Sequence, residues 1–215
     1  MPERNLVYFA DPMCSWCYGF GPVIAALAER FEDRMALQMV MGGLRAGNTE
    51  PMTDKDREYI RGAWTRVGAA TGQPFDMSFF DRPSFTYDTE PACRAVVAVR
   101  RLRPDMALAL MARVSRAFYA ENRDMTAADD IAAVAEEAGF DRAGFGAAFA
   151  AAETRNETFR DFLTAEGLGI RGFPTLIAGS EEKGYALLTN GYRPLEDLVD
   201  PLERWLDAGA PVTKA

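Results

Sequence analysis

Two cysteines three residues apart, Cys14 and Cys17, are the residues of this sequence best suited to carry out chemistry. A Cys-x-x-Cys pair that follows a predicted strand and opens a predicted helix is typical of dithiol–disulfide exchange. The unpaired N–H groups and the dipole at a helix N-terminus favour an anion, and such placement lowers a thiol pKa from about 8.5 to roughly 3.5–7.5. We therefore expect Cys14 to attack a disulfide as a thiolate, and Cys17 to resolve the mixed disulfide.

Two other interpretations of the cysteine pair stay open at this point. The cysteines could be small buried core side chains that lie three residues apart by chance. They could also be half of a metal site, although a closed structural zinc site takes four ligands and the chain has three cysteines and no histidine. The absence of histidine excludes Ser-His-Asp and Cys-His nucleophiles.

Residues beside the pair are candidates for supporting roles. Asp11, three residues before Cys14, either relays a proton or is a loop residue before Pro12. Trp16 either shields the disulfide and gives a peptide a surface to bind, or packs in the core. Because neither Ser15 nor Trp16 is a cation, the thiolate has few stabilising partners. This predicts a weaker oxidant, nearer a reductase or isomerase than a strong oxidase.

Pro174 stands where a central strand is predicted to begin, although a proline cannot donate to a strand ladder. A cis peptide after Phe173 would explain it and would expose the Phe173 backbone for pairing with a substrate strand. The alternative is a trans proline that opens an edge strand.

Other candidates lie in the middle of the chain. Cys93, near the start of a predicted helix, is either a buried core side chain or a third functional thiol. Phe79, Phe80 and Tyr87 lie outside clear helical patterns, so among the aromatic residues they are the better candidates to line a cleft. Aromatic and methionine residues in this part of the chain are more often core residues than substrate-binding ones, and this applies to Trp64, Phe79, Phe80, Phe118 and Met111.

The elements that must position the cysteines begin with strand, helix, strand. Residues 6–10 and 36–41 are short apolar runs of the β type, and the helical pattern after Cys14 lies between them. This order predicts a right-handed crossover onto a parallel pair of strands. Pro22 lies within the first turns of the helix, where we expect a kink.

In residues 51–167 the pattern changes from strands to a succession of helices. Thr53 with Asp56, and Thr126 with Asp129, are typical of helix starts with a capping box. Apolar residues recur at helical spacing in 90–102, 104–119, 141–152 and 153–166. Strands are predicted at 173–178 and 186–189, and Pro194 opens a last helix. The fold class predicted is α/β, with residues 1–50 and 168–215 sharing one mixed sheet and 51–167 forming a large all-helical insertion domain.

Composition excludes several kinds of partner. The 215 residues include 24 Lys and Arg and 32 Asp and Glu, a formal charge of −8, which repels nucleic acid. No segment approaches the roughly 20 apolar residues of a membrane span. The apolar run near the N-terminus is shorter than the roughly 7–15 residues of a secretory signal. We therefore expect a cytoplasmic protein with no membrane or nucleic-acid partner, and the oligomeric state is left open.

Residues 11–22 (DPMCSWCYGFGP) and 172–175 (GFPT) resemble the DsbA-like branch of the thioredoxin superfamily, and within it the cytosolic FrnE-type proteins. The resemblance covers essentially the whole chain and implies a thioredoxin fold with a helical insertion. It also implies that Cys14 is the nucleophile, Cys17 the resolving cysteine and Pro174 a cis-proline that faces them. The expected substrate-binding residues are Trp16, Phe173, Pro174 and Thr175.

Two departures from this pattern bear on function. Periplasmic DsbA proteins have a histidine where Trp16 stands, and they carry an export signal, which we do not expect in this protein. Kappa-class glutathione transferases and 2-hydroxychromene-2-carboxylate isomerases share the architecture, but generally have serine in place of Cys14 and bind glutathione.

Three functions are therefore compatible with the sequence. The first is a thiol–disulfide oxidoreductase acting on disulfide-containing proteins or small-molecule thiols. The second is a glutathione-dependent transferase or isomerase, and the third is a non-catalytic binding or chaperone module. No metal and no resident cofactor are expected, with glutathione as a candidate co-substrate.

Overall fold

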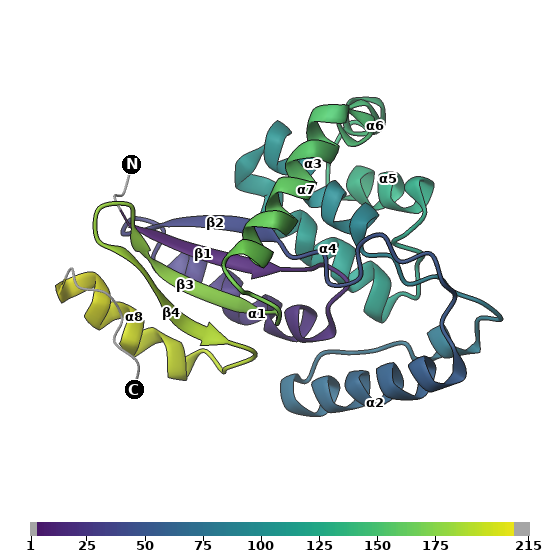
Figure 1. The fold of residues 1–215 in the computed structure, drawn as a ribbon, viewed down its shortest axis with the longest axis horizontal. Helices are drawn as coiled ribbons and strands as arrows, with labels where there is room; N and C mark the ends of the chain where they lie inside the picture. Colours follow the sequence, from purple (N-terminus) through teal and green to yellow (C-terminus); the bar gives the residue numbers. More distant parts are fainter. Residues whose placement is uncertain (1–3, 209–215) are drawn as a thin grey trace.

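The computed structural model describes residues 4–208, and their centre is a four-stranded sheet in the order β2-β1-β3-β4 (Figure 1). The strands are β1 (Asn5–Ala10), β2 (Ala36–Met41), β3 (Thr175–Ser180) and β4 (Gly184–Asn190). β1 and β2 are parallel, whereas β3 is antiparallel to both β1 and β4. The first and last parts of the chain thus share one mixed sheet, as the sequence predicts.

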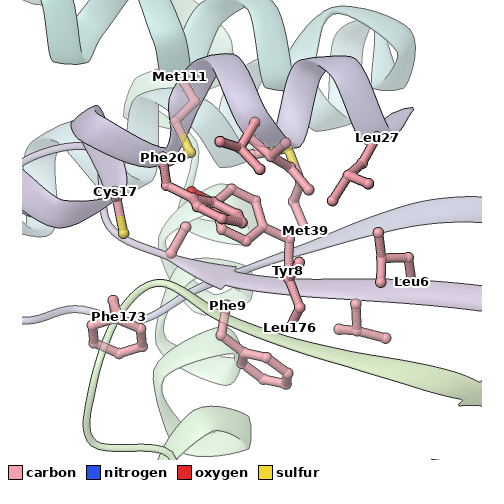
Figure 2. Packing of buried hydrophobic residues seen from close by; sticks show 14 of the residues in the cluster. Leu6, Tyr8, Phe9, Cys17, Phe20, Leu27, Met39, Met111, Phe173 and Leu176 are labelled. Carbon is pink, nitrogen blue, oxygen red and sulfur yellow. The ribbon is translucent and has the colours of Figure 1, made fainter. Parts of the chain in front are cut away.

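Helices pack on both sides of this sheet. Helix α1 (Ser15–Arg30) connects β1 to β2, and α8 (Glu196–Ala208) ends the described chain. Successive side chains of β1 point to opposite faces, so Tyr8 extends towards Phe20 of α1 while Phe9 extends the other way (Figure 2). One cluster of buried apolar side chains includes β1, the inner face of α1 and the apolar face of α8.

The region between β2 and β3 is helical, as predicted. Its elements are α2 (Asp54–Thr71), the 3₁₀ turn η1 (Met77–Asp81), α3 (Glu90–Leu102), the 3₁₀ turn η2 (Pro104–Met106), α4 (Ala107–Ala120), α5 (Ala128–Glu137), α6 (Arg142–Ala150) and α7 (Ala152–Gly167). A second cluster of buried side chains forms here around the ring of Trp64. The α/β class with a large helical insertion is therefore confirmed.

The boundaries at residues 51 and 167 stay a prediction. Side chains from both sides of each boundary share a core: Cys93 and Val96 of α3, Met111 of α4 and Ala165 of α7 are buried in the same cluster as the sheet. The helical region is thus packed against the sheet and can hold its loops in place.

Some local predictions need correction. Thr53 and Asp56 form the predicted capping box of α2. Thr126 does not cap α5, because its hydroxyl donates to Asp124 at 2.6 Å and the helix begins two residues later, at Ala128. β3 begins at Thr175 rather than residue 173. α1 continues through Pro22, where the kink stays a prediction.

Among the helices of residues 4–208, none combines the length and the apolar character that a bilayer-spanning helix needs.

Candidate functional site

Cys14 occupies the N-cap of α1, as the sequence predicts. Its backbone is extended, its N–H donates to the Asp11 carbonyl at 3.0 Å, and its carbonyl accepts from Tyr18 at 3.0 Å as the first bond of the helix. The side chain of Cys14 is 6% exposed, compared with 1% for Cys17. A negative charge on the Cys14 sulfur would therefore lie at the positive end of α1, within reach of the surface.

Cys17 lies behind Cys14 and is a free thiol, as is Cys14. Burial raises the pKa of Cys17 well above its usual range, and a hydrogen bond to the Cys14 sulfur raises it further. Cys17 thus remains protonated where it can donate to a Cys14 thiolate. The two cysteines differ in both exposure and environment, as an attacking and a resolving thiol would need to.

The segment around Pro174 meets the cysteines, although it is far from them in sequence. The Cys14 thiol donates to the Phe173 carbonyl at 3.5 Å, and the Phe173–Pro174 peptide is cis. The Thr175 hydroxyl does not bond to the cysteines and donates instead to the Gly172 carbonyl at 2.8 Å. The substrate-binding roles of Phe173, Pro174 and Thr175 stay predictions.

A groove of about 500 Å³ runs beside Cys14 towards α2. Trp16 and Phe173 line it on the side of the sheet, and Tyr59 and Trp64 of α2 line the opposite wall. Trp16 is half-buried, and its ring also packs 5.9 Å from that of Tyr192. The role of Trp16 in substrate binding stays a prediction.

The charged side chains that line the groove are both cations. They are Arg45, after β2, and Arg66 on α2, and no acidic side chain lines this groove in the described part of the chain. The chain as a whole has a formal charge of −8, so the groove is locally opposite in sign to the protein. Such a groove favours a substrate that carries negative charge.

Asp11 lies in the loop before Pro12 and is completely buried behind Cys14, while a role in proton relay stays a prediction. Its carboxylate accepts hydrogen bonds from the backbone N–H of Met13 at 2.8 Å and of Leu44 at 2.7 Å, and from the Cys93 thiol at 3.5 Å. Burial raises the pKa of Asp11 and of Cys93. Asp11 therefore ties the loop before Cys14 to the segment after β2 and to α3.

Two further residues fix the same loop. The Ser115 hydroxyl donates to the Pro12 carbonyl at 2.7 Å, and the Tyr87 hydroxyl donates to the Met13 carbonyl at 2.7 Å. The Tyr119 hydroxyl lies 3.2 Å from that of Tyr87. Because Tyr87 has a single hydroxyl proton and a carbonyl has none, Tyr119 must donate to Tyr87.

Sequence reasoning missed the contact made by Ser115. A signal was present, because Ser115 is a polar residue on the buried face of α4, beside Met111, Val114 and Phe118. Buried polar groups nearly always have a hydrogen-bond partner, so such a residue points to a nearby orphan carbonyl.

One of the three candidates for the cleft lies in the groove, and the other two are core residues, the more common case for aromatic residues of this region. Tyr87 lines the groove. Phe79 and Phe80 instead pack against Trp64, each with ring centroids 4.9 Å from it, and are buried. Residues 77–81 form a 3₁₀ turn that directs both rings inward, which helical periodicity could not indicate.

Within residues 4–208, no three Cys, Asp or Glu side chains come together as a metal site would require.

Comparison with known proteins identifies relatives of the whole chain. The model of the DSBA-like thioredoxin domain family matches residues 5–203. A protein of Nitrosomonas europaea with the provisional designation of protein disulfide isomerase is 35% identical, with 95% of this chain and 98% of that chain covered and a TM-score of 0.89. Among curated protein sequences, none matches the chain.

Two further structures are informative. The cytosolic disulfide reductase DsbM of Pseudomonas aeruginosa is 28% identical, with 95% of this chain and 99% of that chain covered and a TM-score of 0.79. A 2-hydroxychromene-2-carboxylate isomerase is 17% identical over 95% of this chain and 97% of that chain, with a TM-score of 0.68, which shows a shared fold alone.

Proposed function

This chain belongs to the DSBA-like thioredoxin domain family, and from that premise we propose that it exchanges dithiols for disulfides through Cys14 and Cys17. The observation that carries the proposal is the arrangement of the pair. Cys14 caps α1 beside an open groove, and Cys17 lies behind it as a buried, protonated thiol. Two core cysteines placed by chance would not need this asymmetry.

The reaction has two steps. In the first, the Cys14 thiolate attacks one sulfur of a substrate disulfide, forms a Cys14–substrate disulfide and releases the other substrate sulfur as a thiolate. In the second, the Cys17 sulfur attacks that of Cys14, the Cys14–substrate bond breaks, and the leaving sulfur takes the Cys17 proton. Two electrons pass from the cysteines to the substrate, and the reverse sequence oxidises a dithiol.

The N-terminus of α1 stabilises the Cys14 thiolate, both before the attack and when Cys14 leaves in the reverse direction. When Cys14 is protonated, the Phe173 carbonyl, 3.5 Å from the Cys14 sulfur, accepts a hydrogen bond from its thiol. The proton held on Cys17 keeps it from competing for the substrate until Cys14 has reacted.

The proposal extends to direction and location. We propose that the protein acts as a reductase or isomerase, because Ser15 and Trp16 add no positive charge that would make the reduced pair unusually stable. We also propose that it acts in the cytoplasm. The likeness to a cytosolic disulfide reductase, DsbM, supports this direction.

The groove suggests which small substrates are used. Arg45 and Arg66 would attract the carboxylates of glutathione or of a glutathione mixed disulfide. A structure of the reductase DsbM with glutathione, 28% identical to this chain, supports glutathione as the co-substrate that restores the thiols. Disulfide-containing proteins would lie along the same groove.

Turnover of insulin with dithiothreitol tests the central claim. The wild-type protein should accelerate reduction, and Cys14→Ser should abolish the effect while it keeps the wild-type melting temperature. A wild type that gives no acceleration but binds glutathione tightly would favour the transferase or isomerase instead. No acceleration together with suppressed aggregation of a client would favour a chaperone module.

A matched set of arginine variants tests the substrate. Arg45→Ala and Arg66→Ala should each raise KM for oxidised glutathione several-fold with a smaller change in kcat, and added salt should reduce the difference. Arg142→Ala, an equal loss of charge at an exposed position of α6, is the control and should leave KM unchanged. Equal KM values in all four proteins would contradict the proposed role of the groove cations.

A further inference from the structure

Arg45 is the groove cation that lies in a turn rather than on a helix, so its position depends on what holds its backbone. Its guanidinium lies 5.3 Å from the centre of the Tyr87 ring. In the described part of the chain no carboxylate pairs with it. The guanidinium is therefore available to an anion in the groove, as long as the turn keeps it there.

Two consecutive residues at the start of α3 hold this turn. The Arg45 N–H donates to the Thr89 hydroxyl at 3.2 Å, and the Gly47 N–H donates to the Asp88 carboxylate at 2.8 Å. Arg45 and Thr89 are 44 residues apart in the sequence. The turn that carries the cation is thus attached to the helical region and not only to the end of β2.

Thr89 uses its hydroxyl in an unusual way. It is the N-cap residue of α3, where a threonine hydroxyl ordinarily accepts from the first turn of the helix, yet it makes no such bond. The Asp88 carboxylate accepts from the Glu90 N–H instead, at 3.0 Å. Thr89 is completely buried, and its hydroxyl bonds to Arg45 and to the Asp11 carboxylate. Because a hydroxyl can donate one proton and also accept, both bonds form together.

The Asp11 carboxylate joins the turn to the loop that carries the nucleophile. One of its oxygens accepts from the Leu44 N–H at 2.7 Å, and the other accepts from the Met13 N–H at 2.8 Å. Two successive N–H groups of the turn, those of Leu44 and Arg45, are therefore bound by Asp11 and Thr89. Since Met13 directly precedes the nucleophile, this network fixes the place of Arg45 relative to the reacting sulfur.

We propose that Thr89 is a positioning residue for glutathione specificity, which holds Arg45 where its guanidinium meets a carboxylate of a glutathione disulfide bound at Cys14. This inference rests on the proposed exchange reaction and on glutathione as its small substrate. Thr89 does not line the groove, so it acts through Arg45 and touches no substrate. Without the hydroxyl, the Arg45 N–H would lose its acceptor, and the turn would shift to find another.

Two disulfides that differ in charge test this role. Oxidised glutathione carries carboxylates, and bis(2-hydroxyethyl) disulfide is neutral. Acid quenching and mass spectrometry give the rate constant for oxidation of the reduced protein by each, and their ratio measures the preference for glutathione. Thr89→Val keeps the shape of the side chain without the hydroxyl and should lower this ratio about 3- to 10-fold. Thr89→Ser, which keeps the hydroxyl, should retain a ratio near that of the wild type.

The effect should depend on Arg45. Arg45→Ala sets the upper limit of the loss, and in the double variant Thr89→Val should lower the ratio no further. Thr158→Val, the same change at a completely buried position of α7, is the matched control and should keep the wild-type ratio. Thr89→Ala should give the same result as Thr89→Val and replaces it if the valine variant does not fold.

The outcomes separate this inference from the proposal on which it rests. A wild-type ratio in Thr89→Val, together with a lowered ratio in Arg45→Ala, would overturn the role of Thr89 alone. Equal slowing with both disulfides, or additive losses in the double variant, would also overturn it, because Thr89 would then not act through Arg45. A wild-type ratio in Arg45→Ala would contradict the groove cation itself, and a wild-type protein that reacts with neither disulfide would contradict the exchange reaction.

Discussion

The Ser115 hydroxyl on α4 donates a 2.7 Å hydrogen bond to the carbonyl of Pro12, which is 103 residues away in the sequence and two residues before Cys14. Tyr87 makes an equivalent bond to the next carbonyl, that of Met13. Two consecutive carbonyls of the loop that carries the nucleophile are therefore held by side chains of the helical region. The insertion positions Cys14 as well as forming one wall of its groove.

Replacing Ser115 by Ala should destabilise the protein and disturb Cys14. The buried Pro12 carbonyl would lose its partner, at a cost of about 1–3 kcal/mol in the free energy of unfolding. Urea denaturation measures this change, and the rate of Cys14 alkylation reports on the loop. Thr65→Ala removes an exposed hydroxyl that bonds within its own helix, and it should change both quantities little. Equal effects of the two substitutions would argue against a special role for Ser115.

Cys17→Ser should trap the first intermediate of the proposed reaction. Without the second sulfur, the Cys14–substrate disulfide cannot be resolved, so incubation with oxidised glutathione should add one glutathione per chain. Mass spectrometry of the intact protein counts the additions, and digestion locates them. The double variant Cys14→Ser/Cys17→Ser should add none. Modification that persists in this double variant would point to Cys93 and contradict the assignment.

Asp11 should make stability depend on pH in a direction that can be stated. Burial raises its pKa above the ordinary 3.8, despite hydrogen bonds from Thr89 and the backbone. The folded protein then holds this proton more tightly than the unfolded chain does. The stabilisation is complete below the unfolded pKa and is lost as pH rises through the folded pKa.

Asn at position 11 cannot titrate, so it provides the comparison. As pH rises from about 4 to 7, the free energy of unfolding of the wild type should fall relative to that of Asp11→Asn. Asp11→Asn should also be less stable than wild type near neutral pH, because an amide presents a donor to the N–H groups of Met13 and Leu44. A stability difference that does not vary with pH would rule out titration of Asp11 in this range.

Gly42→Ala should displace Phe173. A methyl group added at Gly42 would lie 2.1 Å from the tip of the Phe173 ring, closer than any real contact, so the ring must shift, and we expect its backbone to follow. The Phe173 carbonyl would then move relative to the Cys14 sulfur. We expect a loss of insulin-reduction rate of about tenfold, since small displacements near reacting atoms are costly. Gly167→Ala, in open space on α7, is the control and should leave the rate unchanged.

Arg100 should be important for stability because it covers the free edge of the sheet. Its guanidinium donates to the Met39 carbonyl of edge strand β2 at 2.6 Å and pairs with Asp161 at 2.8 Å and Glu157 at 2.7 Å. Arg100→Met would leave the half-buried carboxylate of Asp161 without its cation, whereas Glu157 keeps its pair with Arg101 at 2.9 Å, and we expect a loss of about 2–4 kcal/mol. Thermal and urea unfolding measure it. Arg103→Met, which breaks an exposed pair with Asp105, should leave the unfolding midpoint unchanged.

Local signals account for the elements that the sequence predicts well. The strand at residues 36–41 and the helix at 90–102 have the predicted bounds. The signals that predict them, apolar spacing and flanking Gly or Pro residues, depend only on residues a few positions apart. Cys14 at the start of α1 follows from the strand, turn and helix around it. Thr126 shows the limit, since its hydroxyl had a competing partner in Asp124.

By itself, the sequence determined the order of the elements, the thioredoxin fold class with its helical insertion, and the placement of two thiols one turn apart at a helix start. Only the tertiary structure decided what surrounds those thiols. The Phe173 carbonyl is 159 residues from Cys14, and the Ser115 hydroxyl is more than 100 residues from Pro12. Such contacts depend on how helices and sheet pack, and packing follows from the whole buried surface rather than from any local pattern.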